Sequence, residues 1–137
     1  MDSERKIMIV DDNPDILLSL RTVFETEKYE VTTVDNGWKC ITELKQGFRG
    51  IIILDIMMPV LDGIETIKKM VVEGFIEDNT IVVLTVKKIQ GEEFDEVYKY
   101  IHDYIQKPFD VDHLLNTVNN ISQENKLKQK NLQKNLL

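Results

Sequence analysis

The chain has 137 residues, of which 42% are hydrophobic and 30% charged, and its net charge at pH 7 is −7. This length provides for one domain with one hydrophobic core, because domains most often have about 100 to 150 residues. The negative charge predicts repulsion from nucleic acids and from anionic lipid surfaces, so we expect direct binding to neither.

The same composition argues against several classes of protein. No apolar run approaches the roughly 18 residues of a membrane span, and the start of the chain, Met1 to Lys6, is too polar for a signal peptide. Cys40 is the single cysteine, which rules out an internal disulfide, and Cys40 with His102 and His113 is too sparse a set for a zinc site. We therefore expect a cytoplasmic protein without a membrane anchor.

Short apolar runs alternate with longer amphipathic segments along residues 5–121. The runs are rich in β-branched and aromatic residues, which is typical of β-strands. Three runs are apolar throughout, as expected for strands buried on both faces of a parallel sheet, while the two threonines of the second run favour an edge position. In chain order, the predicted strands are Lys6–Val10, Tyr29–Val34, Ile51–Leu54, Ile81–Leu84 and Tyr104–Ile105.

Each predicted strand is followed by apolar residues at helical spacing. In the first such segment, Ile16, Leu20 and Val23 fall on one helix face, and Asn13-Pro14 supply the N-cap and the first helical residue. The other four stripes consist of Ile41 and Leu44; Ile64, Ile67, Met70 and Val71; Phe94 and Val97; and Val111, Leu114, Leu115, Val118 and Ile121. Because crossovers between parallel strands are right-handed, this (βα)5 alternation predicts an α/β fold, a doubly wound parallel sheet with helices on both faces.

Polar side chains stand at the ends of four of the five predicted strands. Asp11 and Asp12 follow the first strand, Asp55 the third, Thr85 the fourth and Lys107 the fifth. In a doubly wound sheet ligands bind outside the carboxyl ends of the strands, so we expect these side chains to converge. Three carboxylates close together repel one another and call for a cation, and oxygen ligands favour Mg²⁺ or Mn²⁺.

The remaining two residues of this set, Thr85 and Lys107, indicate which ligand binds beside the cation. A fixed positive charge on Lys107 and the hydroxyl of Thr85 suit a tetrahedral anion with spread charge, which indicates a phosphoryl group. A carboxylate can attack phosphorus and hold the group as an acyl phosphate. Asp55, which stands alone at the end of an apolar strand, is the best candidate for this role, while the Asp11-Asp12 pair is predicted to bind the metal.

Over residues 5 to about 121 the sequence resembles the receiver domain of two-component response regulators. The resemblance rests on Asp11-Asp12, Asp55-Ile56-Met57-Met58-Pro59, Asp62-Gly63, Thr85, Tyr104 and Lys107-Pro108-Phe109, in this order and at these spacings. It implies a flavodoxin-like three-layer sandwich with strand order 2-1-3-4-5. It also implies a signalling domain that accepts a phosphoryl group, not an enzyme that turns over an outside substrate.

Individual roles follow from the resemblance. It implies that Asp55 is the phosphoacceptor, and that Mg²⁺ binds to Asp12, Asp55 and the backbone carbonyl of Met57, with Asp11 acting through water. Lys107 is then the partner of the phosphoryl oxygens.

The resemblance further implies a switch and partners. Thr85 swings toward the phosphoryl group and Tyr104 rotates inward behind it, which remodels the surface formed by the fourth helix, the fifth strand and the fifth helix. The phosphodonor is a phosphohistidine on a sensor histidine kinase or a histidine phosphotransfer protein. The output passes to a downstream protein target or to an effector domain outside this sequence, and the oligomeric state is left open, a homodimer included.

Two positions depart from the family pattern, and two other functions stay open. Val86 replaces the small residue that usually follows the threonine, and Lys99-Tyr100-Ile101 replaces the usual Ala-Gly-Ala before the last strand. An aspartyl-phosphate phosphatase or phosphotransferase is disfavoured, because the sequence shows no cap or substrate-binding insertion. A pseudo-receiver that binds partners without phosphorylation is disfavoured by the complete acid set with Thr85 and Lys107.

Other residues are expected to be structural. We predict solvated surface positions for Asp15, Asp35, Asp62 and Asp78, and loop packing for the side chains of Met57 and Met58.

The C-terminal segment differs from the rest of the chain in charge. Residues 122–137 hold four lysines and one glutamate, a net charge of +3, which leaves −10 on residues 1–121. The apolar stripe of the fifth helix stops at Ile121, and the leucines beyond it are separated by Lys, Gln and Asn. We therefore predict a receiver domain at 1–121 and a basic tail or linker at 122–137, which can be helical but is not needed for the core.

Overall fold

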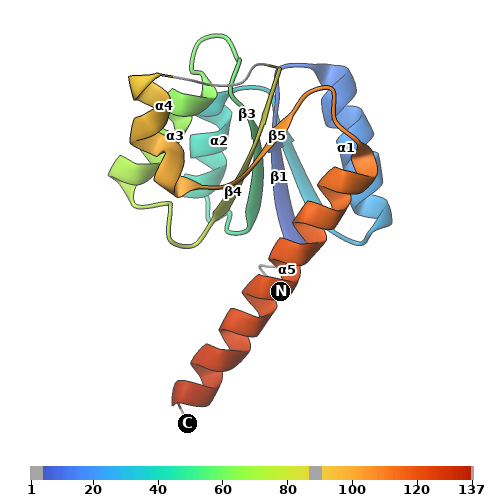
Figure 1. The fold of residues 1–137 in the computed structure, drawn as a ribbon, viewed down its shortest axis with the longest axis vertical. Helices are drawn as coiled ribbons and strands as arrows, with labels where there is room; N and C mark the ends of the chain where they lie inside the picture. The colour runs from blue at the N-terminus through green and yellow to red at the C-terminus, as the bar shows by residue number, and fades with distance from the viewer. Residues whose placement is uncertain (1–4, 87–90, 137) are drawn as a thin grey trace.

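Five parallel strands form the centre of the structure, a computed structural model that describes residues 5–86 and 91–136 (Figure 1). The strands are β1 (Lys6–Val10), β2 (Glu30–Val34), β3 (Ile51–Asp55), β4 (Thr80–Thr85) and β5 (Ile101–Gln106). Their order across the sheet is β2-β1-β3-β4-β5. This order confirms the prediction, including the edge position of the second strand.

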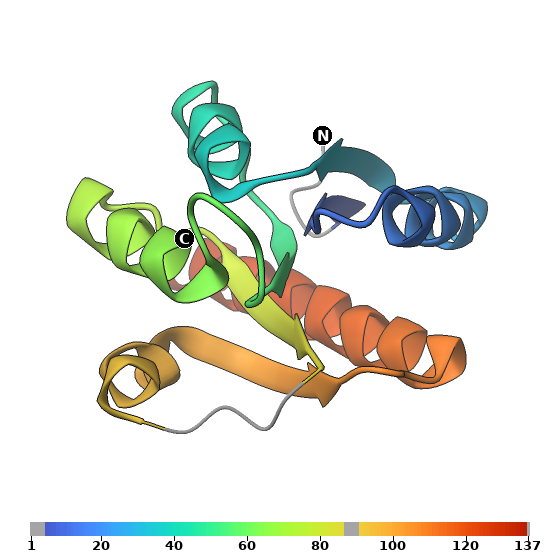
Figure 2. The same ribbon diagram turned by 90° about the horizontal axis from the view of Figure 1, so that it is seen from above.

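Helices cover both faces of the sheet. They are α1 (Pro14–Thr26), α2 (Gly37–Lys45), α3 (Gly63–Glu73), α4 (Glu92–Val97) and α5 (Val111–Leu136), with a short 3-10 helix at Tyr98–Tyr100. Figure 2 shows α1 and α5 on one side of the sheet and α2, α3 and α4 on the other, which confirms the three-layer sandwich. No helix among the described residues is both long enough and apolar enough to cross a membrane.

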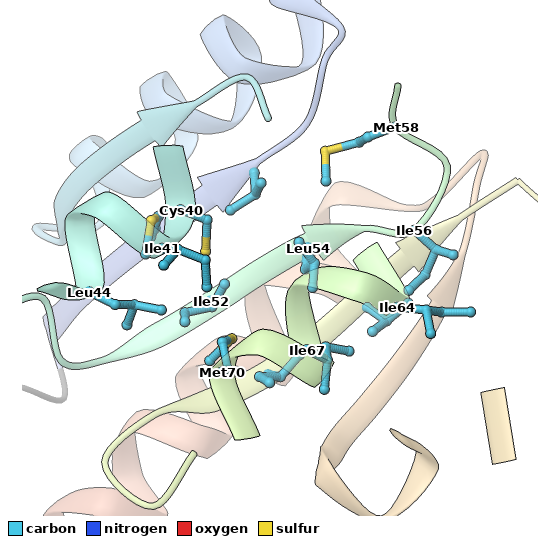
Figure 3. Close-up of a cluster of buried hydrophobic side chains, with 14 of the residues drawn as sticks. Cys40, Ile41, Leu44, Ile52, Leu54, Ile56, Met58, Ile64, Ile67 and Met70 are labelled. Carbon is cyan, nitrogen blue, oxygen red and sulfur yellow. The ribbon is translucent and has the colours of Figure 1, made fainter. Parts of the chain in front are cut away.

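One apolar cluster lies on each face of the sheet. On the side of α2, α3 and α4, Ile52 and Leu54 of β3 pack with Ile67 of α3 (Figure 3). Ile53, which points the other way, belongs to the cluster formed with α1 and α5. All of Ile51–Asp55 is buried, because this central strand is covered on both faces. The strand therefore delivers Asp55 to the edge of the sheet from a fixed position.

The predicted extent of the last strand was wrong. β5 runs from Ile101 to Gln106, well beyond the predicted Tyr104–Ile105. Its early residues His102 and Asp103 are exposed, since β5 is an edge strand, and their polar side chains concealed the start of the strand in the sequence. The fourth helix ends in the 3-10 turn, and Ile101 already belongs to the strand.

Helix α5 continues without a break to Leu136, so the residues predicted as a tail are helical up to that point. Figure 1 shows its second half extending beyond the sheet. Tyr29 connects this helix to the core, because its hydroxyl lies 2.7 Å from Asn119 Oδ1 and 2.8 Å from the buried Ser122 Oγ. Side chains from 123 to 135 are exposed apart from the half-buried Asn125. The division of the chain at residue 121 stays a prediction.

Deletion of residues 123–137 is expected to change the free energy of unfolding by less than about 0.5 kcal/mol, as surface changes usually do. The deleted part buries little, and Ser122 with its bond to Tyr29 is kept. Thermal unfolding followed by circular dichroism measures the effect. The matched control is deletion from Asn119 onward, which also removes the buried Ile121 and should cost at least about 2 kcal/mol. Unfolding of the shorter deletion would place the tail in the core.

Candidate functional site

Three carboxylates and one lysine meet at the carboxyl edge of the sheet. Asp11 and Asp12 follow β1, Asp55 ends β3, and one oxygen from each of the three lies within 4.8 Å of the other two. Asp11 and Asp55 are buried, whereas Asp12 is exposed. Lys107 reaches them from the connection after β5. The structure therefore brings together the charged residues that the strand ends predicted.

The turn after β1 fixes Asp11. Its backbone N–H donates to the carbonyl of Val34 at 3.2 Å, which joins the turn to the end of β2. Its Oδ1 accepts from the backbone N–H of Asn13 at 2.9 Å. The side chain of Asn13 in turn accepts from the N–H of Asp15 and caps α1. One oxygen of Asp11 is thus used in the turn, and Oδ2 faces the site.

Asp55 is held at the floor of the site, 4% exposed. Its Oδ1 accepts from the backbone N–H of Met57 at 3.1 Å. Gly63, which begins α3, lies so close that a Cβ atom there would stand 2.6 Å from the backbone oxygen of Asp55 and 2.7 Å from Cα of Ile56. Glycine at this position therefore allows the helix to start directly beside the acceptor residue.

Lys107 is the ammonium group of the site. Its Nζ lies 2.7 Å from Asp11 Oδ2 and 3.6 Å from Asp55 Oδ2. Its backbone N–H donates to the carbonyl of Thr85 at 2.6 Å, which ties the connection after β5 to the end of β4. One positive charge facing three carboxylates leaves a net negative pocket that can accept more positive charge.

The electrostatics of the pocket act most strongly on Asp55. Burial, followed by the charge of Asp11, raises the pKa of the Asp55 carboxyl above its usual range, and the ammonium of Lys107 offsets this in part. The ionised form is therefore disfavoured by its surroundings, and a divalent cation among these oxygens would relieve the cost. Carboxylate oxygens at this separation fit Mg²⁺ or Mn²⁺ in their chemistry.

Thr85 and Tyr104 occupy neighbouring strands behind the pocket. Thr85 is fully buried at the end of β4 and stands opposite Gln106 of β5. Tyr104 is half-buried on β5, and its ring centroid lies 6.4 Å from that of Phe94 on α4. The aromatic contact links β5 to α4, so a rotation of Tyr104 would change the packing of that helix.

Two expectations for the loop after β3 were wrong. Asp62 is not simply a solvated acid, because its Oδ1 accepts from the N–H of Glu65 at 2.8 Å and caps α3. The sequence carried a signal for this, since Asp62 is followed by Glu65 three residues later. Met58 is buried as predicted, but the side chain of Met57 is 51% exposed.

An apolar groove opens beside Lys107. It has a volume of about 750 Å³ and lies between α1 and the connection from β5 to α5. Ile16, Leu20 and Phe109 line its walls, and Val86 and Lys107 belong to its lining as well. The groove and the charged pocket thus share Lys107.

Comparison with known proteins gives a consistent family. The model of the response regulator receiver domain matches residues 7–119. The response regulator SaeR of Staphylococcus aureus is 36% identical over 118 residues, which cover 84% of this chain and 49% of SaeR. The chain thus spans about half the length of the curated relatives it matches.

Solved structures of similar proteins point to the same family. The receiver domain protein of Methanospirillum hungatei JF-1 superposes with a TM-score of 0.84 at 32% identity, covering 90% of this chain and 98% of that one. TrrA of Thermotoga maritima, a response regulator solved in complex with Mg²⁺ and BeF, superposes with a TM-score of 0.72 at 28% identity, covering 85% and 98%. With the family model, these likenesses show that the chain belongs to the response regulator receiver domain family.

Proposed function

We propose that this receiver domain accepts a phosphoryl group on Asp55 from a phosphohistidine, in a reaction that depends on Mg²⁺. The observation that carries the proposal is the position of Asp55, recessed among two other carboxylates with Lys107 Nζ at 3.6 Å. Phosphoryl transfer needs little beyond positioning and neutralisation of charge, and this set of residues can supply both. We also place the reaction in the cytoplasm.

The acid cluster is suited to hold the metal. Asp12, Asp55 and the backbone carbonyl of Met57 would bind Mg²⁺, with Asp11 acting through water, and Mn²⁺ would be accepted by the same oxygens. When bound, the ion supplies positive charge to the phosphoryl oxygens. The complex of TrrA with Mg²⁺ and BeF supports this reading, since TrrA is a relative with the same fold.

The covalent step is an in-line displacement. A carboxylate oxygen of Asp55 forms a bond to phosphorus while the P–N bond of the phosphohistidine breaks, and the imidazole nitrogen takes the electron pair. Lys107, now 2.7 Å from Asp11, would turn its ammonium to the new phosphoryl oxygens. No separate catalytic base is required, because Asp55 attacks as a carboxylate.

Signalling would follow from the same change in charge. The hydroxyl of Thr85 would move toward the phosphoryl group and Tyr104 would turn inward, which alters the surface of α4, β5 and α5. The contact of Tyr104 with Phe94 offers the route to α4. Addition of beryllofluoride with Mg²⁺ should shift NMR signals near Thr85 and Tyr104. Shifts confined to the loops that hold the acids would contradict the switch.

The partners follow from the chemistry and from the relatives. The donor would be a sensor histidine kinase or a histidine phosphotransfer protein, and the apolar groove beside Lys107 is where we place it. The curated relatives are about twice as long as the matched region. We propose that the output passes to a downstream protein target or to an effector domain.

One experiment separates the candidate functions. The chain is incubated with Mg²⁺ and acetyl phosphate, and its intact mass is measured over time. A stable gain of one phosphoryl group on Asp55 is the expected result. Fast turnover without accumulation would favour a phosphatase or phosphotransferase, and no gain in mass would favour a pseudo-receiver.

We expect the phosphoaspartate to be long-lived. Met57, two residues after Asp55, offers no carboxylate or amide to orient an attacking water, and we expect Val86, which is exposed directly after β4, to shield its approach. Lys87, two residues after Thr85, has neither a carboxylate nor an amide in its side chain. This residue lies outside the described residues. The double variant Met57→Asn, Val86→Ala should hydrolyse at least about tenfold faster, in the range of a positioned polar group. Unchanged decay of the labelled mass would contradict the shielding.

A further inference from the structure

Val60 combines two unfavourable features. Its backbone φ is +71°, in the left-handed region, and its side chain is 85% exposed. A left-handed backbone is costly for any residue with a Cβ atom and most of all for a β-branched one. The exposed isopropyl group regains none of this cost by burial within the chain. Glycine or asparagine would adopt the same backbone more easily.

The loop around Val60 is fixed on both sides. Met58, two residues before it, and Leu61, directly after it, are both buried. The N–H of Gly63 donates to the carbonyl of Ile56 at 3.0 Å and closes the loop at its base. The backbone at Val60 therefore cannot relax without moving buried side chains, and the loop presents the valine to solvent in a set direction. Such preorganisation lowers the cost of a contact with a partner.

Val60 lies on the side of the molecule that a phosphodonor must cover. Figure 1 shows the loop between β3 and α3 at the end of the sheet where the strands terminate in the acid cluster. Met57, in the same loop, and Val86, at the end of β4, are 51% and 55% exposed. Asp55 is recessed at this edge, so a donor protein has to approach it over these apolar side chains.

Val86 also belongs to the apolar groove. It is exposed directly after β4 and lines the groove beside Lys107. A protein seated in the groove would therefore meet apolar side chains on its way to the acceptor carboxylate.

We propose that Val60 is a specificity-determining contact for the phosphohistidine protein that phosphorylates Asp55. The proposal rests on the proposed function and adds to it the residue that recognises the donor. The donor is favoured over a downstream target because only the donor must reach the recessed carboxylate. The contact is between proteins, so a small donor such as acetyl phosphate does not make it.

The test compares two equally exposed valines. Val60→Asn keeps the backbone conformation and removes the apolar contact, and the matched control is Val72→Asn on α3, where the valine is also 85% exposed. The probes are acetyl phosphate and the purified, autophosphorylated histidine kinases of the source organism, of which the fastest donor to the wild-type chain is used. Both reactions are followed by the phosphorylated fraction of the chain.

For Val60→Asn we expect an unchanged rate with acetyl phosphate and an about tenfold lower kcat/KM with the kinase, carried by KM. Its melting temperature should equal or exceed that of the wild type, which excludes unfolding as the cause. Val72→Asn should match the wild type with both donors. Equal kinase transfer to Val60→Asn and wild type would overturn the proposal, and so would an equal loss of rate with acetyl phosphate and with the kinase.

Two further outcomes distinguish a failure of the proposed function from a failure of the role of Val60. If acetyl phosphate fails to label Asp55, the proposed function itself is contradicted. If acetyl phosphate labels Asp55 but no kinase of the panel labels the wild-type chain, the protein donor is lacking, and the role of Val60 is overturned while phosphorylation of Asp55 stands.

Discussion

Replacement of Asp55 by asparagine is expected to abolish labelling by acetyl phosphate and Mg²⁺, whereas the wild-type chain gains one phosphoryl group. An amide is not a nucleophile toward phosphorus under these conditions, and Asp55 is the carboxylate that the end of β3 places at the floor of the site. Intact mass spectrometry reads the result directly, and peptide mapping locates the group in the wild-type chain.

Asp35→Asn is the matched control for this change. Asp35 is an exposed acid that pairs with Lys39 at 3.0 Å and is not one of the three clustered carboxylates. The Asp35→Asn variant should be labelled at the wild-type rate. Full labelling of Asp55→Asn at another residue would show that the acceptor is assigned incorrectly.

Asp55→Asn should also change the free energy of unfolding, by an amount that depends on pH. In the absence of metal, burial and the charge of Asp11 raise the pKa of Asp55 in the folded state, so the ionised carboxylate destabilises the fold above that pKa. Asp55→Asn should therefore be more stable at pH 7, by about 1 kcal/mol, the usual size of a single-site effect. The gain should shrink as the pH falls through the raised pKa of the folded state and vanish well below about 4, where the carboxyl is protonated in both the folded and the unfolded state. Urea unfolding at several pH values measures it, and saturating Mg²⁺ should reverse the difference.

The sequence predicted the site through topology. Parallel strands end at one edge, so polar residues directly after Val10, Leu54 and Leu84 had to meet there, whatever the details of the loops. The central strand was equally predictable, because a strand that is buried on both faces consists of an unbroken apolar run. The fold and the meeting of the charged residues were therefore predictable from strand order and strand ends.

Details that depend on tertiary contacts were not predictable in this way. The start of β5 carries exposed polar residues, and pattern alone does not separate an edge strand from a loop. The left-handed backbone of Val60 contradicts the preference of valine and arises from the buried residues on either side of it. The bond from Lys107 to Asp11 joins residues 96 positions apart, and nothing in the sequence pattern indicates that the lysine pairs with this carboxylate.

Lys107→Gln is expected to be the most destabilising change in the site when no metal is present. Lys107 is the ammonium 2.7 Å from Asp11 Oδ2 and 3.6 Å from Asp55 Oδ2, and all three side chains are largely buried. Removing one member of a buried ion pair leaves its partner uncompensated and costs about 3 kcal/mol. For a domain of this size the melting temperature should fall by roughly 10 °C.

The comparison that isolates this effect is Lys45→Gln. Lys45 pairs with Glu73 at 3.4 Å on an exposed surface, where the loss of an ion pair should cost less than about 1 kcal/mol. Saturating Mg²⁺ should restore most of the stability of Lys107→Gln but not its labelling by acetyl phosphate, because the ion relieves the repulsion among the carboxylates while the phosphoryl oxygens still lack the ammonium. A variant that melts like the wild type without metal would show that Lys107 does not balance the acid cluster.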